Sequence, residues 1–454
     1  MRDDRVRAIL DAHLDDMPKH ALFPTVDRLN GELRDIVGRH RRVARLARVG
    51  TSRLGDPLLL ASIGNGGRHV LVVGGPHPNE PVGFRTVLEA ARMVASAPEL
   101  TTGLDLTWHF VPCLDPDGAR LNERWYTAPL TISAYHRHFF RPALAHQPEW
   151  AFPCASGGAR FDAVLPETRS LMRVIDALRP DVLVSLHNSD FGGAHFVVSH
   201  PVPGLPEALA GAADRRGIPL ETDNADTTGW PDVAPGVHLM PPIESLLIVD
   251  PRGDARALPH GACSIHYAAR HRALAMFTEV PLWRVGVTES PRIGYAEALR
   301  RSAADMDAAV DVLDELLARV GPVDGRQPMV WAAVRDTMAI ARTASRHWRE
   351  ISRQDHGRRP VTPAEWAGTR DYVRQLPLRA AGMLLRALRV EHAAGDRRPP
   401  RAELDRLEGH FDRWCHRMRE ETRAEPHPVE RLVALQLEST LAAVLASRRS
   451  AGVA

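Results

Sequence analysis

Cysteine pairs are missing from this chain of 454 residues, whose four cysteines are widely scattered at Cys113, Cys154, Cys263 and Cys415. Because none of them belongs to a C-x-x-C pair, the sequence predicts neither a cysteine-type zinc site nor a disulfide framework. A run of about 18 apolar residues is missing too, and the N-terminus lacks the apolar core of a secretory signal. We therefore expect a cytoplasmic protein that does not span a membrane.

An excess of charge of either sign is also absent. The 58 Lys and Arg residues nearly balance the 56 Asp and Glu residues, for a net charge of +2. No overall field draws the chain toward nucleic acid or an anionic membrane surface, so we expect neither as a partner. With 44% hydrophobic and 25% charged residues, the composition is that of a soluble globular protein, which excludes a largely disordered chain.

Short apolar runs alternate with helical stretches between residues 60 and 290. The runs are rich in β-branched and aromatic residues and have Gly or Pro at their edges, which is typical of buried strands. Their alternation with helices predicts an α/β fold with a mixed, mostly parallel central sheet flanked by helices. The expected strands are residues 69–75, 104–112, 181–187, 194–200 and 275–281, and the expected helices are residues 25–40, 82–97, 167–178, 207–216 and 260–274.

The strand signal disappears after about residue 293, and Arg-rich helical patterns follow. We therefore divide the chain into an α/β domain, residues 1–292, and a helical C-terminal region, residues 293–454. The Arg residues of that region alternate with Asp and Glu and do not cluster with aromatics, which argues against nucleic-acid binding. We expect the helices to pack on the α/β domain or to close over its pocket; the alternative is that they join copies of the chain in a homo-oligomer.

A His-x-x-Glu motif, His77 and Glu80, follows the expected strand 69–75 in a turn rich in Gly and Pro. An imidazole and a carboxylate at this spacing can reach one Zn²⁺ together, leaving room for a distant third ligand and a water. Open α/β sheets place their sites at the carboxyl ends of strands, which favours this motif. His-x-x-Glu also occurs at residues 146–149 and at residues 427–430, where no strand leads into the motif, and we treat both of these as chance matches.

His187 and Glu279 belong to two other expected strands. His187 ends strand 181–187, from which it can converge on the same metal; the alternative is a strand-edge histidine that only forms hydrogen bonds. Glu279 stands in an apolar strand, where burying a carboxylate without a purpose is costly. Glu279 could serve as the general base that takes a proton from the attacking water. The alternative is that Glu279 faces solvent at the end of its strand.

Together these motifs resemble the zinc carboxypeptidase family, which contains carboxypeptidase A-like metallopeptidases and related deacylases. The order and the spacing of the motifs both fit, from about residue 25 to residue 283. Besides His-x-x-Glu, the matching features are segment 48–64 (RVGTSRLGDPLLLASIG), segment 112–118 (PCLDPDG), His187 after its strand and the Thr-Glu pair at 278–279.

The resemblance implies a central mixed sheet of about eight strands flanked by helices. It also implies Zn²⁺ held by His77, Glu80 and His187, with Glu279 as the general base, in residues 1–292 as the catalytic domain. The implied reaction is the hydrolysis of an amide next to a carboxylate-bearing group.

In the family, an Arg shortly after the Asp-Pro-Asp-Gly-like turn stabilises the oxyanion, and an Asn-Arg pair holds the substrate carboxylate. Spacing favours Arg124 for the oxyanion, with Arg120 as the alternative. For the carboxylate, Arg137 takes the Arg position and His136 replaces the Asn, with Arg141 as the competing candidate. A guanidinium fork suits bidentate carboxylate binding, whereas a His does not reproduce an Asn amide.

Departures from the family leave the substrate open. Asp115 stands where the family usually has Asn, and the mobile tyrosine of carboxypeptidases has only Tyr135 and Tyr267 as candidates. Asn79 before Glu80 is closer to deacylases such as succinylglutamate desuccinylase and aspartoacylase. We expect a zinc metallocarboxypeptidase acting on peptide-like substrates, with an N-acyl amino acid deacylase as the alternative. The alternative of another class is a catalytically silent carboxypeptidase-like fold that serves as a binding module.

Overall fold

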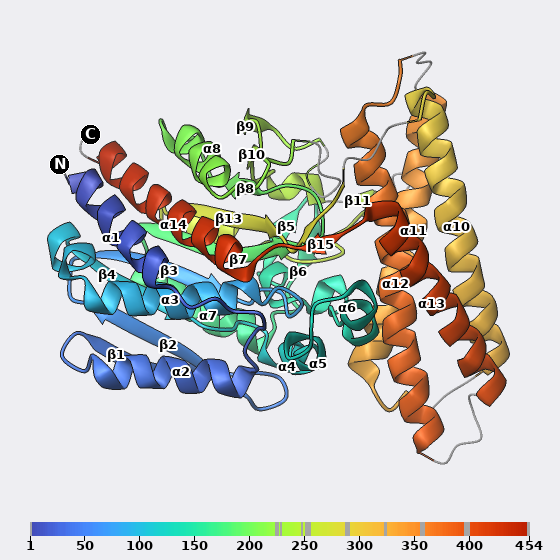
Figure 1. Cartoon of the computed structure of the whole chain (residues 1–454), viewed down its shortest axis with the longest axis horizontal. Helices are drawn as coiled ribbons and strands as arrows, with labels where there is room; N and C mark the ends of the chain where they lie inside the picture. Colours follow the sequence, from blue (N-terminus) through green and yellow to red (C-terminus); the bar gives the residue numbers. More distant parts are fainter. Residues whose placement is uncertain are drawn as a thin grey trace.

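The computed structural model describes residues 2–222, 227, 229–246, 248–249, 256–286, 291–321, 325–354, 359–394 and 400–451. Figure 1 shows two parts, an α/β layer and a bundle of long helices at one end of it. The α-helices are α1 (Arg2–Asp16), α2 (Val26–Arg39), α3 (Val82–Ser96), α4 (Pro116–Arg120), α5 (Glu123–Tyr126), α6 (Ile132–His138), α7 (Pro166–Leu178), α8 (Leu205–Arg215), α9 (Ser264–Ala269), α10 (Tyr295–Val320), α11 (Pro328–Gln354), α12 (Pro363–Ala393), α13 (Arg401–Thr422) and α14 (Val429–Ala451). The strands are β1 (Ala44–Thr51), β2 (Pro57–Gly64), β3 (Arg68–Gly74), β4 (Leu106–Val111), β5 (Cys154–Ser156), β6 (Ala159–Phe161), β7 (Val182–Ser189), β8 (His195–Val198), β9 (Asp232–Ala234), β10 (Val237–Leu239), β11 (Ile248–Val249), β12 (Arg256–Ala257), β13 (Leu274–Pro281), β14 (Trp283–Arg284) and β15 (Glu425–Pro426).

The central sheet has nine strands within the described residues, in the order β1-β2-β4-β3-β7-β13-β8-β10-β9. Its middle is parallel, because β3 pairs with β4 and β7, and β7 pairs with β13. The pairs β1–β2, β2–β4 and β13–β8 are antiparallel. The sheet is therefore mixed with a parallel centre, as the sequence predicted.

The central strands are buried on both faces, and their side chains alternate between two hydrophobic clusters. In β3, Val70 and Val72 join the cluster that contains side chains of α2 and α3, whereas Leu71 and Val73 join the cluster of α7 and α9. Successive side chains of a strand point to opposite faces, so a strand covered on both sides must be apolar throughout. This is why these strands are near-continuous apolar runs in the sequence.

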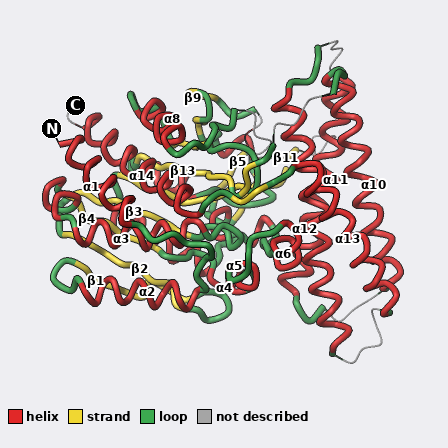
Figure 2. The backbone as a smooth tube through the Cα atoms, viewed as in Figure 1, coloured by secondary structure: helices red, strands yellow, loops and turns green. Residues whose placement is uncertain are grey.

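Helices α10 to α13 form the bundle, and Figure 2 shows that the strands lie in the other part of the molecule. Helix α11 packs between α10 and α12, and α12 also contacts α13. The start of α12 is fixed by a capping box, in which the Thr362 hydroxyl accepts from the Glu365 amide and the Glu365 carboxylate accepts from the Thr362 amide. Among the described residues, no helix is long and apolar enough to cross a membrane.

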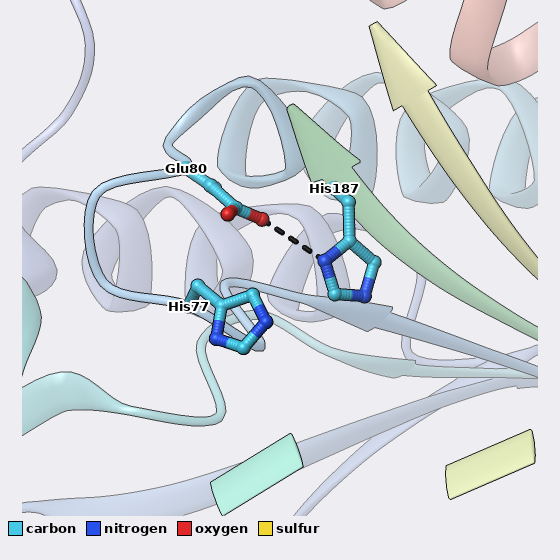
Figure 3. Close-up of side chains that lie close together, drawn as sticks. All are labelled: His77, Glu80 and His187. Atoms are coloured by element: carbon cyan, nitrogen blue, oxygen red, sulfur yellow. Dashed lines mark hydrogen bonds and ion pairs between the residues drawn. The ribbon is translucent and has the colours of Figure 1, made fainter. Parts of the chain in front are cut away.

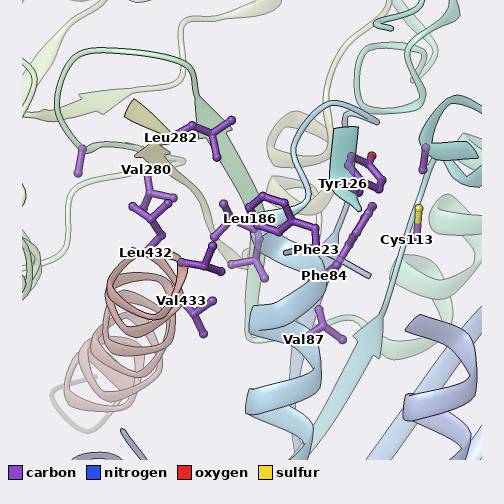
Figure 4. Close-up of a cluster of buried hydrophobic side chains, with 14 of the residues drawn as sticks. Phe23, Phe84, Val87, Cys113, Tyr126, Leu186, Val280, Leu282, Leu432 and Val433 are labelled. Carbon is purple, nitrogen blue, oxygen red and sulfur yellow. The ribbon is translucent and has the colours of Figure 1, made fainter. Parts of the chain in front are cut away.

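The last helix, α14, leaves the bundle and returns across the α/β layer, so that both termini lie at the end far from the bundle (Figure 1). It contacts α3, α8, β7 and β13. Figure 4 shows Leu432 and Val433 of α14 in one cluster with Val280 and Leu282, and all four are buried. Full burial of such a side chain is worth about 1.5–3 kcal/mol, so α14 contributes to the core of the α/β layer. The division at residue 292 stays a prediction, and the chain beyond it packs in both parts.

The expected elements match the described ones closely, with one difference. Helix 25–40 is α2, and the Thr25 hydroxyl accepts from the Arg28 amide at 3.3 Å as its N-cap. The expected helix 260–274 is shorter, because Ala262 first forms a bridge with Phe152 and α9 begins only after it.

Candidate metal centre and cavity

His77 and Glu80 lie on the turn between β3 and α3. At the end of β3, Gly75 adopts φ +54°, a left-handed conformation that favours glycine. A Cβ atom at Gly75 would lie 2.3 Å from Cε1 of Phe84, so a larger residue does not fit. This tight turn holds both side chains at the carboxyl end of the parallel strands, where the sequence placed them.

His187 and Glu279 come from neighbouring parallel strands. In the pairing of β7 with β13, Glu279 stands opposite His187. Nδ1 of His187 lies 3.0 Å from Oε2 of Glu80 and 3.7 Å from Oε1 of Glu279. Figure 3 shows His77, Glu80 and His187 gathered at the strand ends, with the hydrogen bond between Glu80 and His187. The structure therefore brings together the four residues that the sequence singled out.

His77, Glu80 and His187 fit a metal ion. One ligand atom of each lies within 4.8 Å of the others, and no second such group occurs in the described part of the chain. The three residues are only 2%, 3% and 2% exposed, and Nδ1 of His77 is buried without a hydrogen-bond partner. Buried polar atoms normally have a partner, and a metal ion would supply one here. Two imidazoles and one carboxylate form the ligand set of a catalytic zinc site, which leaves a position open for water or substrate.

The surroundings keep His77 neutral, as a metal ligand must be. Burial lowers the pKa of His77 well below its usual range, and the positive charges of Arg141 and His187 lower it further. Burial also lowers the pKa of His187, but the hydrogen bond that His187 donates to Glu80 and the charges of the nearby carboxylates outweigh this effect, so the pKa of His187 is raised. The pKa values of the two imidazoles therefore shift in opposite directions within one site.

Arg141 is the guanidinium that reaches the metal site. Its Nη1 lies 2.7 Å from Oε1 of Glu80 and 3.5 Å from Oδ1 of Asn79. Helix α6 ends at His138, and the extended backbone of Phe139 turns the chain so that Arg141 lies beyond the helix. The competing candidate of the sequence analysis is thus the Arg that lies at the site.

Arg137 and His136, expected to hold the substrate carboxylate, do not line the cavity beside the metal site. Arg137 pairs with Glu408 and with Asp412 of α13, the latter at 2.8 Å. His136 is fully buried against Tyr135, and burial lowers its pKa to about 3. The reason is that both residues lie on α6, which packs against α12 and α13.

Arg124 and Arg120, expected at the oxyanion, also lie outside the cavity lining. Arg124 is exposed on α5. Arg120 at the end of α4 pairs with Asp56 at 2.7 Å and with Asp27 at 2.8 Å. Helix α4, which begins within the Asp-Pro-Asp-Gly turn, and helix α5 after it thus leave both Arg residues outside the cavity lining.

A cavity of about 320 Å³ lies beside Glu80 and Glu279, between the α/β layer and the bundle. This volume is at the small end for a ligand site. Helices α11 and α12 form one wall, so the helical region closes over the site, which is one of the two arrangements expected for it. The polar residues of this wall include Asp336 of α11 and Asp371, Tyr372 and Arg379 of α12.

Two buried amides in the cavity lining were missed in the sequence. Asn188 accepts from the Val82 amide at 3.3 Å, which leaves its Nδ2 buried without a partner. Gln147 donates from Nε2 to the carbonyl oxygen of Pro142 at 2.9 Å, which leaves its Oε1 without a partner. The position after His187 could have drawn attention to Asn188, but no local pattern marks Gln147.

Neither candidate for the mobile tyrosine lines the cavity. The hydroxyl of Tyr267 donates to Asp176 at 2.8 Å, and that of Tyr135 donates to Asp190 at 2.5 Å. Tyr372 of α12 does line the cavity, and it lies in the helical region, outside the segment of the resemblance.

Comparisons with known proteins agree with these motifs. The zinc carboxypeptidase family model matches residues 29–190, which include His77, Glu80 and His187 but not Glu279. No curated protein matches the sequence. Similar solved structures include a metallo-carboxypeptidase from Burkholderia cenocepacia, with 17% identity, 55% of this chain and 59% of that chain covered, and a TM-score of 0.34. They also include carboxypeptidase A from Helicoverpa armigera, with 11% identity, coverage of 77% and 80%, and a TM-score of 0.39.

Bovine thrombin-activatable fibrinolysis inhibitor, in complex with tick carboxypeptidase inhibitor, is similar at 11% identity, coverage of 58% and 86%, and a TM-score of 0.36. These structural likenesses are distant, and the family match rests on the sequence of residues 29–190. The resemblance of this chain to the zinc carboxypeptidase family, inferred from its motifs, is thereby confirmed.

Proposed function

We propose that this protein is a zinc-dependent hydrolase that cleaves an amide bond next to a carboxylate-bearing residue, as a metallocarboxypeptidase of peptide-like substrates. The observation that carries the proposal is the convergence of His77, Glu80 and His187, with Glu279 beside them, at the edge of a cavity. Zn²⁺ held by the first three residues would polarise the substrate carbonyl and lower the pKa of a water molecule.

We assign the role of general base to Glu279. Its side chain is 19% exposed and lines the cavity, so water and substrate can reach it. Its carboxylate would take a proton from the attacking water and return it to the nitrogen of the leaving amine. One residue can perform both transfers because the first converts it into the acid that the second needs.

Arg141 would stabilise the negative charge that develops on the substrate carbonyl oxygen. Its contact with Glu80 places its guanidinium next to a metal ligand. Of the described residues that line the cavity, only Arg141 and Arg379 are cationic, and Arg379 pairs with Asp190 at 2.7 Å. A fixed positive charge beside the reacting oxygen is worth far more in such a site than in water.

An N-acyl amino acid deacylase is the second candidate, and the small cavity favours it. A volume of about 320 Å³ under the wall of α11 and α12 suits an acyl-amino acid or a short peptide better than a long chain. Both reactions use the same metal ligands and base, so the substrate alone separates them.

The test compares N-blocked dipeptides with N-acyl amino acids as substrates of the zinc-loaded protein. Glu279→Gln is compared with Glu207→Gln, which makes the same change at an exposed residue of α8. We expect hydrolysis by the wild type and the control and its loss in Glu279→Gln. Faster cleavage of dipeptides supports the carboxypeptidase, and faster cleavage of N-acyl amino acids supports the deacylase. Substoichiometric zinc and no hydrolysis of either class would contradict the proposal and leave the silent binding fold.

A further inference from the structure

The cavity wall is rich in carboxylates beyond those of the metal site. Six carboxylates and two guanidinium groups line it, and none of the other lining residues is a Lys or a His. Apart from Glu80 and Glu279, whose tasks are described above, four acids remain: Asp190, Glu221, Asp336 and Asp371. Arg141 already contacts Glu80. Arg379 pairs with Asp190, so the described lining away from the candidate metal site holds more acidic than basic side chains.

The charge of Asp371 is only partly compensated. Its carboxylate lies 3.2 Å from Arg374, but the same guanidinium also pairs with Glu421 at 2.8 Å, so one cation serves two acids. Burial raises the pKa of Asp371 to about 7; Arg374 opposes this rise, whereas Glu221 and Asp190 add to it. Asp371 of the bundle and Glu221 of the α/β layer line the same cavity, and the charge of Glu221 contributes to the raised pKa of Asp371.

Glu221 is held in place by the backbone. Its Oε2 accepts from the Gly193 amide at 3.0 Å, in the segment that follows β7. The same segment contains Asp190, whose carboxylate accepts from the Tyr135 hydroxyl and pairs with Arg379. Hydrogen bonds and an ion pair therefore hold the carboxylates of Glu221 and Asp190 in place. Both residues line the same cavity as Asp371 of α12.

A second observation points to a ligand with N–H donors. Gln147 lines the same cavity and is only 4% exposed. Its Nε2 bond to the Pro142 carbonyl fixes the orientation of the amide, and its Oε1 is buried without a donor. An acceptor in this position is satisfied when a bound molecule brings an N–H group.

We propose that Glu221 and Asp371 bind a positively charged group of the substrate, an ammonium or a guanidinium. The helical region then supplies a residue that determines specificity, in addition to closing the site. This inference rests on the proposed hydrolase function for its substrate class. A cation placed between two carboxylates gains charge-assisted hydrogen bonds and removes their repulsion.

The test uses pairs of ligands that differ only in the ammonium group. In the first pair, N-acetylglycyl-lysine carries the ammonium on the C-terminal side of the amide and N-acetylglycyl-norleucine lacks it. In the second pair, N-acetyl-lysyl-glycine carries the ammonium on the other side of the amide and N-acetyl-norleucyl-glycine lacks it. For both pairs, kcat/KM is measured with the zinc-loaded wild type, and Kd is measured with zinc-loaded Glu279→Gln. We expect a lysine preference of about 10-fold or more in at least one pair, the size of one charge-assisted hydrogen bond.

Asp371→Asn and Glu221→Gln should each reduce this preference and leave the norleucine ligand nearly unchanged. Glu315→Gln, a change at an exposed ion pair of α10, is the control that removes a charge of the bundle outside the cavity. A variant that merely folds poorly would weaken both ligands equally, so the lysine-to-norleucine ratio isolates the charge.

The outcomes separate the two proposals. Hydrolysis without any lysine preference, or a preference that survives both variants, would overturn the cation site and leave the hydrolase standing. A lysine preference in Kd that both variants reduce, without hydrolysis of any ligand, would support the cation site and contradict the hydrolase.

Discussion

Glu279 stands directly opposite His187 in the parallel pair formed by β13 and β7, and Oε1 of Glu279 lies 3.7 Å from Nδ1 of His187. This relationship is set by the ladder of the sheet. A slip of one residue in the pairing would turn Glu279 to the other face of the sheet. The proposed base and one proposed metal ligand are therefore positioned by two largely buried strands in the parallel centre of the sheet.

Replacing the proposed base should stop the reaction without emptying the metal site. We expect Glu279→Gln to lower kcat by about 10²–10⁴-fold, the usual contribution of a general base. The zinc content should stay at the wild-type level, because Glu279 lies outside the group of His77, Glu80 and His187. Steady-state kinetics and metal analysis of the same sample check both points, and a variant that keeps its kcat would refute the assignment.

Arg141 and Arg137 should differ sharply when each is replaced by alanine. Arg141→Ala should lower kcat by about 10²-fold or more, as the loss of one oxyanion donor does. Arg137→Ala removes partly exposed ion pairs with α13 and should cost at most about 1 kcal/mol of folding free energy, with kcat unchanged. If Arg141→Ala instead raised only KM, and only for substrates that carry a carboxylate, the role of Arg141 would be to bind that carboxylate. Equal kinetic effects of the two changes would contradict our reading of the site.

Asp115 should make the stability depend on pH. Burial raises the pKa of Asp115 to about 7, although Arg53 and the Gly118 amide oppose the rise. Between about pH 4 and pH 7 the folded chain keeps a proton that the unfolded chain loses. The free energy of unfolding therefore falls as the pH rises through this window, by at most about 1.4 kcal/mol per pH unit from this residue.

Asp115→Asn should remove this loss of stability at higher pH, because an amide does not ionise. The amide oxygen of Asn can still accept the hydrogen bond from the Gly118 amide. Urea unfolding at pH 5 and pH 7 should show that the variant gains stability relative to the wild type at the higher pH. Asp35→Asn, at an exposed position of α2, is the matched control. The same pH dependence in Asp115→Asn and wild type would show that Asp115 ionises normally in the folded chain.

The return of α14 to the sheet should be visible in stability. Leu432 is 1% exposed, and Leu432→Ala should lower the free energy of unfolding by about 2–5 kcal/mol, because it leaves a cavity in the core of the α/β layer. Leu54→Ala, at a residue that is 71% exposed, should cost far less. Chemical denaturation of both variants measures the difference, and equal losses would mean that α14 does not belong to this core.

The sheet and the convergence of His77, Glu80 and His187 could be predicted because their signals are local. The run that forms β3 is apolar throughout, since both faces of the strand are covered, and His77 and Glu80 follow it within one turn. His187 stands near the end of the next apolar strand of the parallel centre. Parallel strands bring their carboxyl ends to one edge, so position within the strands was enough to predict the site.

The cationic residues of the site could not be chosen from spacing. Arg137 and Arg141 are separated by one turn, but α6 ends between them and directs them to different surroundings. The Arg137 side chain contacts α13, and Arg141 contacts Glu80. Where a helix ends depends on tertiary packing, which outweighs the weak local preferences of these residues.

The cavity wall could not be predicted for a different reason. An apolar stripe at helical spacing, such as that of α11, shows that a helix is buried on one side, but it does not identify what covers that side. Asp371 joins Glu221 only through the docking of the bundle on the α/β layer. Contacts between residues this far apart in the chain leave no periodic trace in the sequence.

The central claim is a zinc site made by His77, Glu80 and His187, and the zinc content of the purified protein tests it most directly. We predict about one Zn²⁺ per chain in protein prepared without chelator. His77→Ala and His187→Ala should lose it, whereas His146→Ala, at an exposed histidine of an unused His-x-x-Glu motif, should keep it. A wild type that takes up no zinc, or zinc retained by both His77→Ala and His187→Ala, would contradict the account.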